Sequence, residues 1–236
     1  MLLRRVLLVL VLIVLGGCAT KFRFPLNRMI TPESVGGAFN SEFDIGKVGQ
    51  AEGKVDISSS SPFPINTEQV DGMSYFGALS FTESIDFYWN HTADAPSIVG
   101  GRYQFLGGSQ QAGGAGHSMA VTLGFGGNEH ESEDSPKVEF AISASDLSLV
   151  HGYWFTPFWQ IFETLAYTTY GVEGKIGGAG GGKIQERLKQ TTAAVGTALV
   201  FKPMKVKFEA SYSQLDWSDS KDRTYVSYAM ALGFNF

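Results

Sequence analysis

The sequence predicts an all-β fold, a closed antiparallel up-and-down transmembrane β-barrel of about ten strands, with eight or twelve as the alternatives. Three observations predict this fold. The stretch 224–236 alternates bulky apolar side chains with small or polar ones, and the chain is rich in glycine (29 residues) and in aromatic residues (13%). After residue 18, no apolar stretch is long enough for a transmembrane helix. Strands that span a bilayer must close into a barrel, because an open sheet edge cannot be satisfied in lipid.

The last stretch shows which face meets lipid. Large side chains such as Val226, Met230 and Phe236 occupy even positions, and Ser, Ala, Gly and Asn occupy most odd positions. Successive side chains of a strand point to opposite faces, so one face is large and apolar and the other small. We predict that the large row faces lipid and the small row faces the lumen. The ending Phe234-Asn235-Phe236 resembles the C-terminal signal of bacterial outer-membrane β-barrels, which implies the barrel-assembly machinery as a partner.

The start of the chain predicts its compartment. Arg4 and Arg5 precede the aliphatic run Val6–Leu15, which is too short to span a bilayer as a helix and is typical of a signal peptide. The sequence Leu15-Gly16-Gly17-Cys18 resembles the bacterial lipobox, and Cys18 is the only cysteine. The resemblance implies cleavage before Cys18 and attachment of lipid, palmitate included, to its thiol and new amino group. Ala19 at the next position implies delivery to the outer membrane.

These signals divide the chain into a lipoprotein signal peptide (1–17), a lipid anchor with a periplasmic linker (18–37) and an outer-membrane barrel (38–236). We expect the stretch 21–35 either to follow anionic headgroups or to be a solvated linker. Ten strands return the chain to the side on which the barrel starts. Both termini are therefore expected in the periplasm, with the lipid of Cys18 in the periplasmic leaflet and the longer loops outside.

Ten stretches carry the strand pattern, each justified by apolar alternation or by β-forming residues. They are residues 39–57, 73–81, 85–90, 99–105, 118–126, 138–155, 161–174, 191–201, 205–213 and 224–236. The first loosens in its second half, the fifth and ninth alternate clearly, and the seventh is assigned from its length and β-formers. In the sixth, the apolar positions change from even (Phe140, Ile142) to odd (Leu147, Leu149). This change predicts a β-bulge between Ser143 and Asp146.

The connections fit a membrane barrel, which has short turns on the periplasmic side and longer loops outside. Short turns are predicted at 82–84, 156–157 and 202–203. Outer loops are predicted at 58–71, 175–189 and 218–223, and the connection 107–117 is long for its periplasmic side. Aromatic residues at the strand ends predict two girdles. The periplasmic girdle is Phe81, Phe105, Phe155, Phe158, Trp159, Phe201, Phe234 and Phe236, and the outer one is Trp89 and Trp217.

Charged residues on the inward row are the candidate site. Strand parity places eight of them in the lumen: Glu42, Asp44, Asp86, Arg102, Glu139, Lys205, Lys207 and Glu209. A ten-stranded barrel is only slightly wider than the eight-stranded barrel that side chains fill. Unpaired charges there are costly, so we expect opposite signs to pair into a polar plug. The alternative is a narrow water-filled pore whose lining sets ion preference.

Other chemistry has weaker support. Residues 177–183 fit G-x-x-x-x-G-K, but Ile184 stands where a phosphate-binding loop needs Ser or Thr, so no nucleotide or other cofactor is expected. No metal site is predicted from the four histidines, His91, His117, His130 and His151, which lack close ligand spacing. His130 lies among acidic residues at 129–134, which suit either a divalent cation or, as we prefer, a solvated hairpin tip.

An enzyme is not predicted. Asp146, Ser148 and His151 are the one compact catalytic-type set, and Ser148 and His151 have opposite parity. Removal of residues 1–17 changes the net charge from −5 to −7, which argues against a nucleic-acid partner. We therefore expect a lipid-anchored outer-membrane barrel with a plugged lumen and a structural or interaction role. The alternatives are a narrow ion or solute channel and a lipid-modifying enzyme; membrane lipid is an expected partner, and homo-oligomerisation is left open.

Overall fold

The computed structural model describes residues 21–55, 65–110, 112, 116–131, 138–176 and 182–236. Its strands are β1 (Lys21–Pro25), β2 (Ser41–Val55), β3 (Ile65–Ser80), β4 (Ile85–Thr92), β5 (Ser97–Leu106), β6 (Gly116–Glu131), β7 (Val138–Thr156), β8 (Trp159–Ile176), β9 (Lys183–Phe201), β10 (Met204–Trp217) and β11 (Arg223–Asn235). Within the described ranges, no helix is long and apolar enough to cross a membrane.

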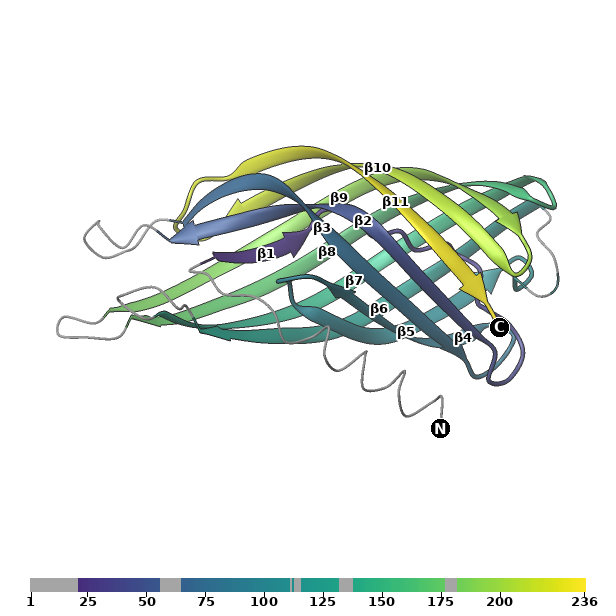
Figure 1. Cartoon of the computed structure of the whole chain (residues 1–236), viewed down its shortest axis with the longest axis horizontal. Helices are drawn as coiled ribbons and strands as arrows, with labels where there is room; N and C mark the ends of the chain where they lie inside the picture. The colour runs from purple at the N-terminus through teal and green to yellow at the C-terminus, as the bar shows by residue number, and fades with distance from the viewer. Residues whose placement is uncertain (1–20, 56–64, 111, 113–115, 132–137, 177–181) are drawn as a thin grey trace.

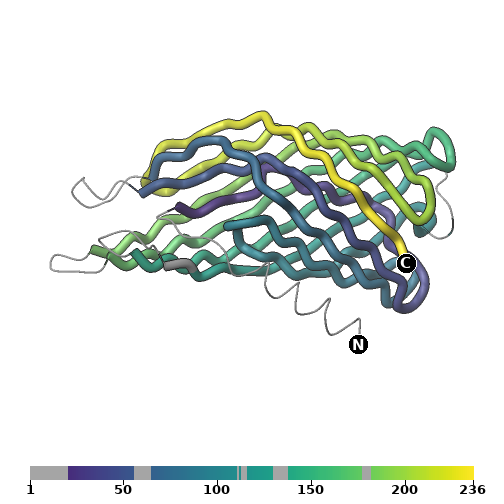
Figure 2. The backbone as a smooth tube through the Cα atoms, in the orientation of Figure 1, coloured from purple at the N-terminus to yellow at the C-terminus, as the bar shows by residue number. Residues whose placement is uncertain are grey.

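Strands β2 to β11 form the barrel. Each pairs antiparallel with its neighbour in the chain, and β11 pairs with β2 to close the ring. The prediction of a closed antiparallel barrel of ten strands is therefore confirmed. The strands run obliquely along a long tube (Figures 1 and 2). We call the end with the C-terminus and the short turns at 81–84, 157–158 and 202–203 the turn end, and the opposite end the loop end.

Large apolar side chains cover the outer wall, as predicted. Met230 is 54% exposed, whereas its neighbours Ala229 and Ala231 on the inward row are buried. The same holds around the ring for the exposed side chains Phe87, Leu123, Leu149, Leu165, Val195, Phe208, Tyr212 and Tyr228. The inward row is mostly polar, small or charged. This arrangement is the reverse of a water-soluble barrel and suits a wall that meets hydrocarbon.

The closing seam between β11 and β2 is paired only toward the turn end, from Met230 opposite Lys47 to Asn235 opposite Glu42. Toward the loop end, β1 takes the free edge of β2, from Pro25 opposite Gln50 to Lys21 opposite Lys54. Residues 48–53 of β2 are consequently buried on both faces. The seam is therefore built from three strands, with β1 supplying the hydrogen bonds that β11 does not reach.

The predicted bulge in β7 does not exist. The pairing of β7 with β8 is continuous from Val138 to Trp154, and every even-numbered side chain in that range is buried. Phe140 and Ile142 therefore face the lumen and not the lipid, and the first shift of register lies between Trp154 and Thr156. The apolar pattern changes parity because the inward side chains of β7 are apolar near its start, at Phe140 and Ile142, and polar farther along, at Asp146 and Ser148.

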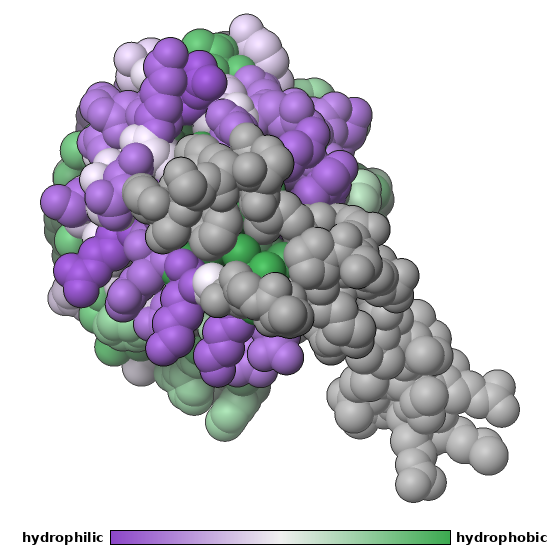
Figure 3. Space-filling view, turned by 90° about the vertical axis from the view of Figure 1, so that its left-hand side faces the viewer, coloured by the Kyte–Doolittle hydropathy of each residue, from purple (hydrophilic) through white to green (hydrophobic). Residues whose placement is uncertain are grey.

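Two predicted loops are partly strand. β3 begins at Ile65 and β9 at Lys183, inside the stretches 58–71 and 175–189 that were expected to be loops. At the start of β9, Gln185 and Arg187 are exposed while Ile184 and Leu188 are buried. A polar outer face is typical of a strand that has left the bilayer, so apolar alternation could not reveal it. Figure 3 shows the hydrophilic rim that results at the loop end.

The aromatic residues of the turn end lie as predicted; of the two expected in the outer girdle, Trp89 is on the outward row of β4 and Trp217 is not outward. Phe81, Phe155 and Phe201 are about half exposed at the turn end, which suits an interfacial girdle. Trp217, expected in the outer girdle, is buried and faces the lumen. Its indole packs on side chains of the N-terminal segment, described below.

The N-terminal stretch differs most from expectation. Phe22 and residues 24–35 are buried, although the sequence predicts a linker in the periplasm or along headgroups. The stretch starts at the loop end, where Lys21 lies opposite Lys54, and passes inside the barrel to the turn end before β2 begins. Figure 2 shows it as the purple trace within the tube of strands.

A charge on the outer wall tests the membrane orientation. Leu165→Arg puts a guanidinium into the apolar belt of β8, where the hydrocarbon cannot solvate it. The free energy of unfolding in lipid vesicles, measured by urea titration, should fall by about 2–4 kcal/mol. Gln185→Arg, on the polar extension of β9, is the matched control and should change little. Equal effects at both positions would contradict a lipid-facing belt.

Candidate functional site in the barrel lumen

Residues 21–35, which we call the plug, form the core of the site. The plug is tied to β2 along β1 and then crosses the lumen as an irregular chain. Its backbone is bonded to the wall along its length: the amide of Leu26 donates to the carbonyl of Gly49 (2.9 Å), and the amide of Ser34 donates to Oε1 of Gln104 (2.8 Å). These bonds matter because an irregular chain leaves backbone groups that must be paired wherever water is absent.

An aromatic layer fills the loop end of the lumen. Phe22 meets Phe140 with ring centroids 5.3 Å apart, and Phe24 meets Tyr170 at 4.6 Å and Trp217 at 5.7 Å. These rings come from the plug and from β7, β8 and β10. Phe140 and Trp217 face inward because the plug offers them an apolar partner. Sequence parity could not anticipate this, since it treats every large apolar side chain as lipid-facing.

Glu209 on β10 holds the plug at its middle. Its two carboxylate oxygens accept the backbone amides of Arg28 (2.9 Å) and Met29 (2.8 Å), and Nδ2 of Asn27 donates to it (3.2 Å). Met29 has φ 55°, in the left-handed region that costs a non-glycine residue energy. Its carbonyl accepts Nζ of Lys207 at 2.7 Å. The strained turn is therefore fixed on both sides by charged groups of one wall strand.

Arg28 supplies the positive charge of the plug. Its guanidinium lies 2.8 Å from Oδ1 of Asp146 on β7 and also donates to Thr168 on β8. The hydroxyl of Thr168 in turn donates to Asp146 at 2.7 Å. Arg28 and Asp146 are both buried, so each depends on the other for its counter-charge.

Glu33 supplies a negative charge nearer the turn end. Its Oε1 accepts the indole N–H of Trp154 at 2.9 Å and also accepts bonds from Ser118 and Gln160. The three donors come from β6, β7 and β8. The plug is thus joined to the wall by polar groups of both signs, and each lies opposite a complementary group.

Six of the predicted lumen charges form one buried ion-pair network on the wall, in which Arg102 lies 3.5 Å from Glu42. Lys207 lies 2.5 Å from Asp44 and 3.3 Å from Glu42, and Lys205 also pairs with Glu42. Arg102 contacts Asp86 at 2.5 Å and donates to the carbonyl of Thr31 in the plug at 3.0 Å. Seven of the eight predicted side chains are buried in the lumen, namely Glu42, Asp44, Asp86, Arg102, Lys205, Lys207 and Glu209.

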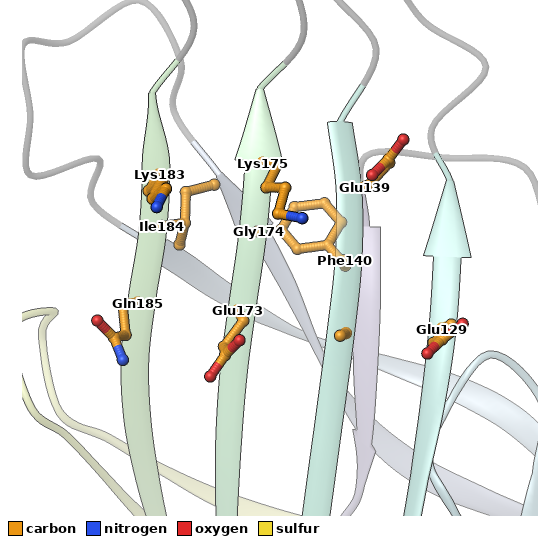
Figure 4. A pocket seen from close by; sticks show the side chains of 10 residues that line it. Glu129, Glu139, Phe140, Glu173, Gly174, Lys175, Lys183, Ile184 and Gln185 are labelled. Atoms are coloured by element: carbon orange, nitrogen blue, oxygen red, sulfur yellow. The ribbon is translucent and has the colours of Figure 1, made fainter.

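Glu139 is the exception, and its predicted inward position is wrong. It is exposed on the outer face of β7, because the bulge that would have turned it inward is absent. It faces Lys175 of β8 in the register, and Lys175 faces Lys183 of β9. Figure 4 shows these side chains around a hollow of about 660 Å³ that Glu129 and Glu173 also line. The hollow is a water-exposed surface on the loop-end extension, with glutamates on β6 and β7 beside lysines on β8 and β9.

Little space remains beside the plug. A cavity lined by Thr31, Glu33, Trp154 and Gln160 has a volume of about 30 Å³, roughly the room of one water molecule. The long connection after β5 closes the turn end: the amide of Gln110 donates to the carbonyl of Ser34 (2.9 Å), and its side chain donates to Glu42 (2.9 Å). Gln110, in the described part of this connection, therefore helps to cover the turn end of the lumen.

The other candidates do not form a reactive site. Ser148 is buried on the inner face, whereas His151 lies on the outer face, with Nε2 3.0 Å from Nδ1 of His117. Among the residues that the structure describes, no group of three or more His, Cys, Asp or Glu side chains has the arrangement of a metal site. Cys18, most of the glycine-rich 177–183 stretch and the side chain of His130 lie outside the described part.

Sequence reasoning missed the plug residues, Arg28 and Glu33 above all. A signal was present: Phe22, Phe24, Leu26, Met29 and Ile30 make the stretch too apolar for a solvated linker. Its periodicity is neither that of a strand nor that of a helix, so pattern matching assigns it no element.

Removal of one partner from the Arg28–Asp146 pair should destabilise the plugged barrel. Asp146→Ala leaves a buried guanidinium without a counter-charge, and the free energy of unfolding should fall by about 3–5 kcal/mol. The double variant Arg28→Met/Asp146→Leu removes both charges and should recover most of that loss. Glu173→Ala, on the exposed face of β8, is the control for a surface carboxylate. A loss no larger than that of Glu173→Ala would show that Arg28 is not seated in the lumen.

Comparisons with known proteins give structural likeness only. No family model matches the chain, and no characterised protein matches its sequence. Among solved structures it is similar to Ail, the attachment invasion locus protein of Yersinia pestis, at 11% identity over 85% of this chain and 100% of that chain, with a TM-score of 0.38. It is also similar to the outer membrane protease OmpT from Escherichia coli, at 10% identity over 84% and 94%, with a TM-score of 0.38. Likeness at this level carries no argument about activity; the barrel itself is established by its strand pairings.

Proposed function

We propose that the protein is a lipid-anchored outer-membrane β-barrel whose lumen is closed by its own N-terminal segment, and that it does no chemistry. Its role is structural or interaction-based, and the polar loop end is the part that would carry it. One observation carries the proposal: residues 24–35 are buried inside the ring of strands, bonded to charged groups of the wall. A lumen filled by the chain itself has no room for a solute path.

The apolar outer wall supports the membrane location. Soluble monomers rarely expose large contiguous apolar patches, and a patch of this kind marks a membrane or a partner. Here the exposed apolar side chains occur on strands all around the ring, with an aromatic girdle at the turn end and a hydrophilic rim at the loop end (Figure 3). The lipobox-like start and the Phe-Asn-Phe ending favour the outer membrane of a bacterium. Lipid and the barrel-assembly machinery are then the expected partners.

A narrow channel is the competing function, and it requires the plug to leave. Departure of the plug would take from Asp146 its ion-pair partner Arg28, and from Glu209 the two amides of Arg28 and Met29. A buried charge that loses its partner costs about 3–5 kcal/mol. Both losses oppose departure of the plug. The closed state is therefore favoured as the resting state of the barrel.

Planar-bilayer recording tests the closed lumen. The wild-type protein should give no steady current, because the plug blocks the path. The variant Asp146→Ala/Glu209→Ala removes two attachments of the plug and should give brief openings. Glu139→Gln, on the outer face, serves as the control and should behave as the wild type does. A steady ion-selective current through the wild-type protein, with a selectivity altered by Lys205→Glu, would establish the channel instead.

A further inference from the structure

The described chain begins and ends at opposite ends of the barrel. Lys21 lies opposite Lys54, near the end of β2, and its Nζ is 3.2 Å from Oε1 of Glu52. Asn235, by contrast, lies opposite Glu42, at the start of the same strand. The length of β2 therefore gives the distance along the wall between Lys21 and Asn235.

The N-terminal end is firmly held at the loop end. The amide of Arg23 donates to the carbonyl of Asp94 (3.2 Å), and its guanidinium contacts the carboxylates of Asp94 (2.9 Å) and Glu52 (2.9 Å). Asp94 belongs to the connection between β4 and β5, at the loop end. Just below, Phe22 and Phe24 are fixed in the aromatic layer. A shift of the plug toward the turn end would draw the charges of Lys21 and Arg23 into this apolar layer.

The distances involved decide where residue 18 can lie. From Glu42 to Lys54, β2 advances by twelve residues, or about 40 Å at roughly 3.3 Å per residue. With the usual tilt of about 40°, this is about 30 Å along the barrel axis, the thickness of the hydrocarbon core. Cys18 precedes Lys21 by three residues, which reach at most about 10 Å. A span of that length is too short to reach from Lys21 back to the turn end.

We propose that the N-terminus of the processed chain lies at the loop end, so that the acyl chains on Cys18 enter the outer leaflet and anchor the protein from the cell surface. The acyl chains would insert into the hydrocarbon of the leaflet that lies beside the loops. The inference rests on the lipoprotein part of the proposed function. Strand number alone places the lipid in the periplasmic leaflet, because ten crossings are even. The plug adds one further crossing through the lumen and reverses the side.

Labelling of intact cells tests the position of the N-terminus. Lys21→Cys, Asp219→Cys at the loop end and Lys202→Cys at the turn end are each treated with a polymer-linked maleimide too large to cross the outer membrane. A lipidated Cys18 has no free thiol to compete. Lys21→Cys and Asp219→Cys should react in intact cells, and Lys202→Cys only after permeabilisation. If Lys21→Cys reacts only after permeabilisation, as Lys202→Cys is expected to do, the proposal is overturned.

The position of the lipid is tested separately. A protease site is inserted between Thr20 and Lys21, and cells are grown with radiolabelled palmitate. Protease added to intact cells should remove the label from the barrel band, because the cut separates Cys18 from the barrel at the surface. Label that is lost only after lysis would place the anchor in the periplasm and refute the inference. The variant Cys18→Ser should carry no label.

The two experiments separate the inference from the function on which it rests. If the uncut protein carries no palmitate, the lipoprotein assignment fails and the lipid cannot be the surface anchor. Maleimide labelling of Lys21→Cys still reports in that case whether the chain crosses its own barrel. A steady wild-type current in the bilayer recording would reject the closed lumen without changing either surface result.

Discussion

A ten-stranded barrel encloses more space than an eight-stranded one, and every charge that faces this space needs a partner. This requirement shapes the whole molecule. Glu209 faces a lumen in which two backbone amides of the plug reach it, and Asp146 faces the guanidinium of Arg28. The wall and the plug therefore complete each other: without the plug, Asp146 and Glu209 lose their partners, and without the wall, Arg28 loses its own. The barrel is best understood as a ring of strands folded around its own N-terminal segment.

The plug also explains why large apolar side chains occur on both faces of the wall. Phe208 and Met230 face outward, on a wall whose apolar belt suits hydrocarbon. Phe140 and Trp217 face inward because Phe22 and Phe24 lie at the loop end of the lumen. A strand that crosses from one environment to the other changes the parity of its apolar residues without a bulge, as β7 does. The same plug fills the gap in the seam, where β1 pairs with β2 beyond the reach of β11.

The sequence predicts the parts of the fold that a uniform environment controls. Hydrocarbon outside the wall imposes one rule along each strand, so Leu123, Phe208 and Met230 reveal their strands and the direction that each side chain faces. The charges Lys205, Lys207 and Glu42 are found by the same rule. The plug cannot be predicted in this way, because Arg28, Met29 and Ile30 form an irregular segment without periodicity. Its contacts also join residues that are far apart in the sequence. Glu139 escapes the rule for a related reason: an outward Phe140 would place Glu139 inward, whereas Phe140 packs on Phe22 in the lumen.

Hydrogen exchange of the plug amides tests the central claim most directly. The amides of Arg28 and Met29 donate to a buried carboxylate within a closed barrel. In the folded protein in lipid or detergent, they should exchange as slowly as the central amides of β7 and β10. Exchange at the rate of an unstructured chain, with the strand amides still protected, would show that the barrel stands without its plug and would contradict the account.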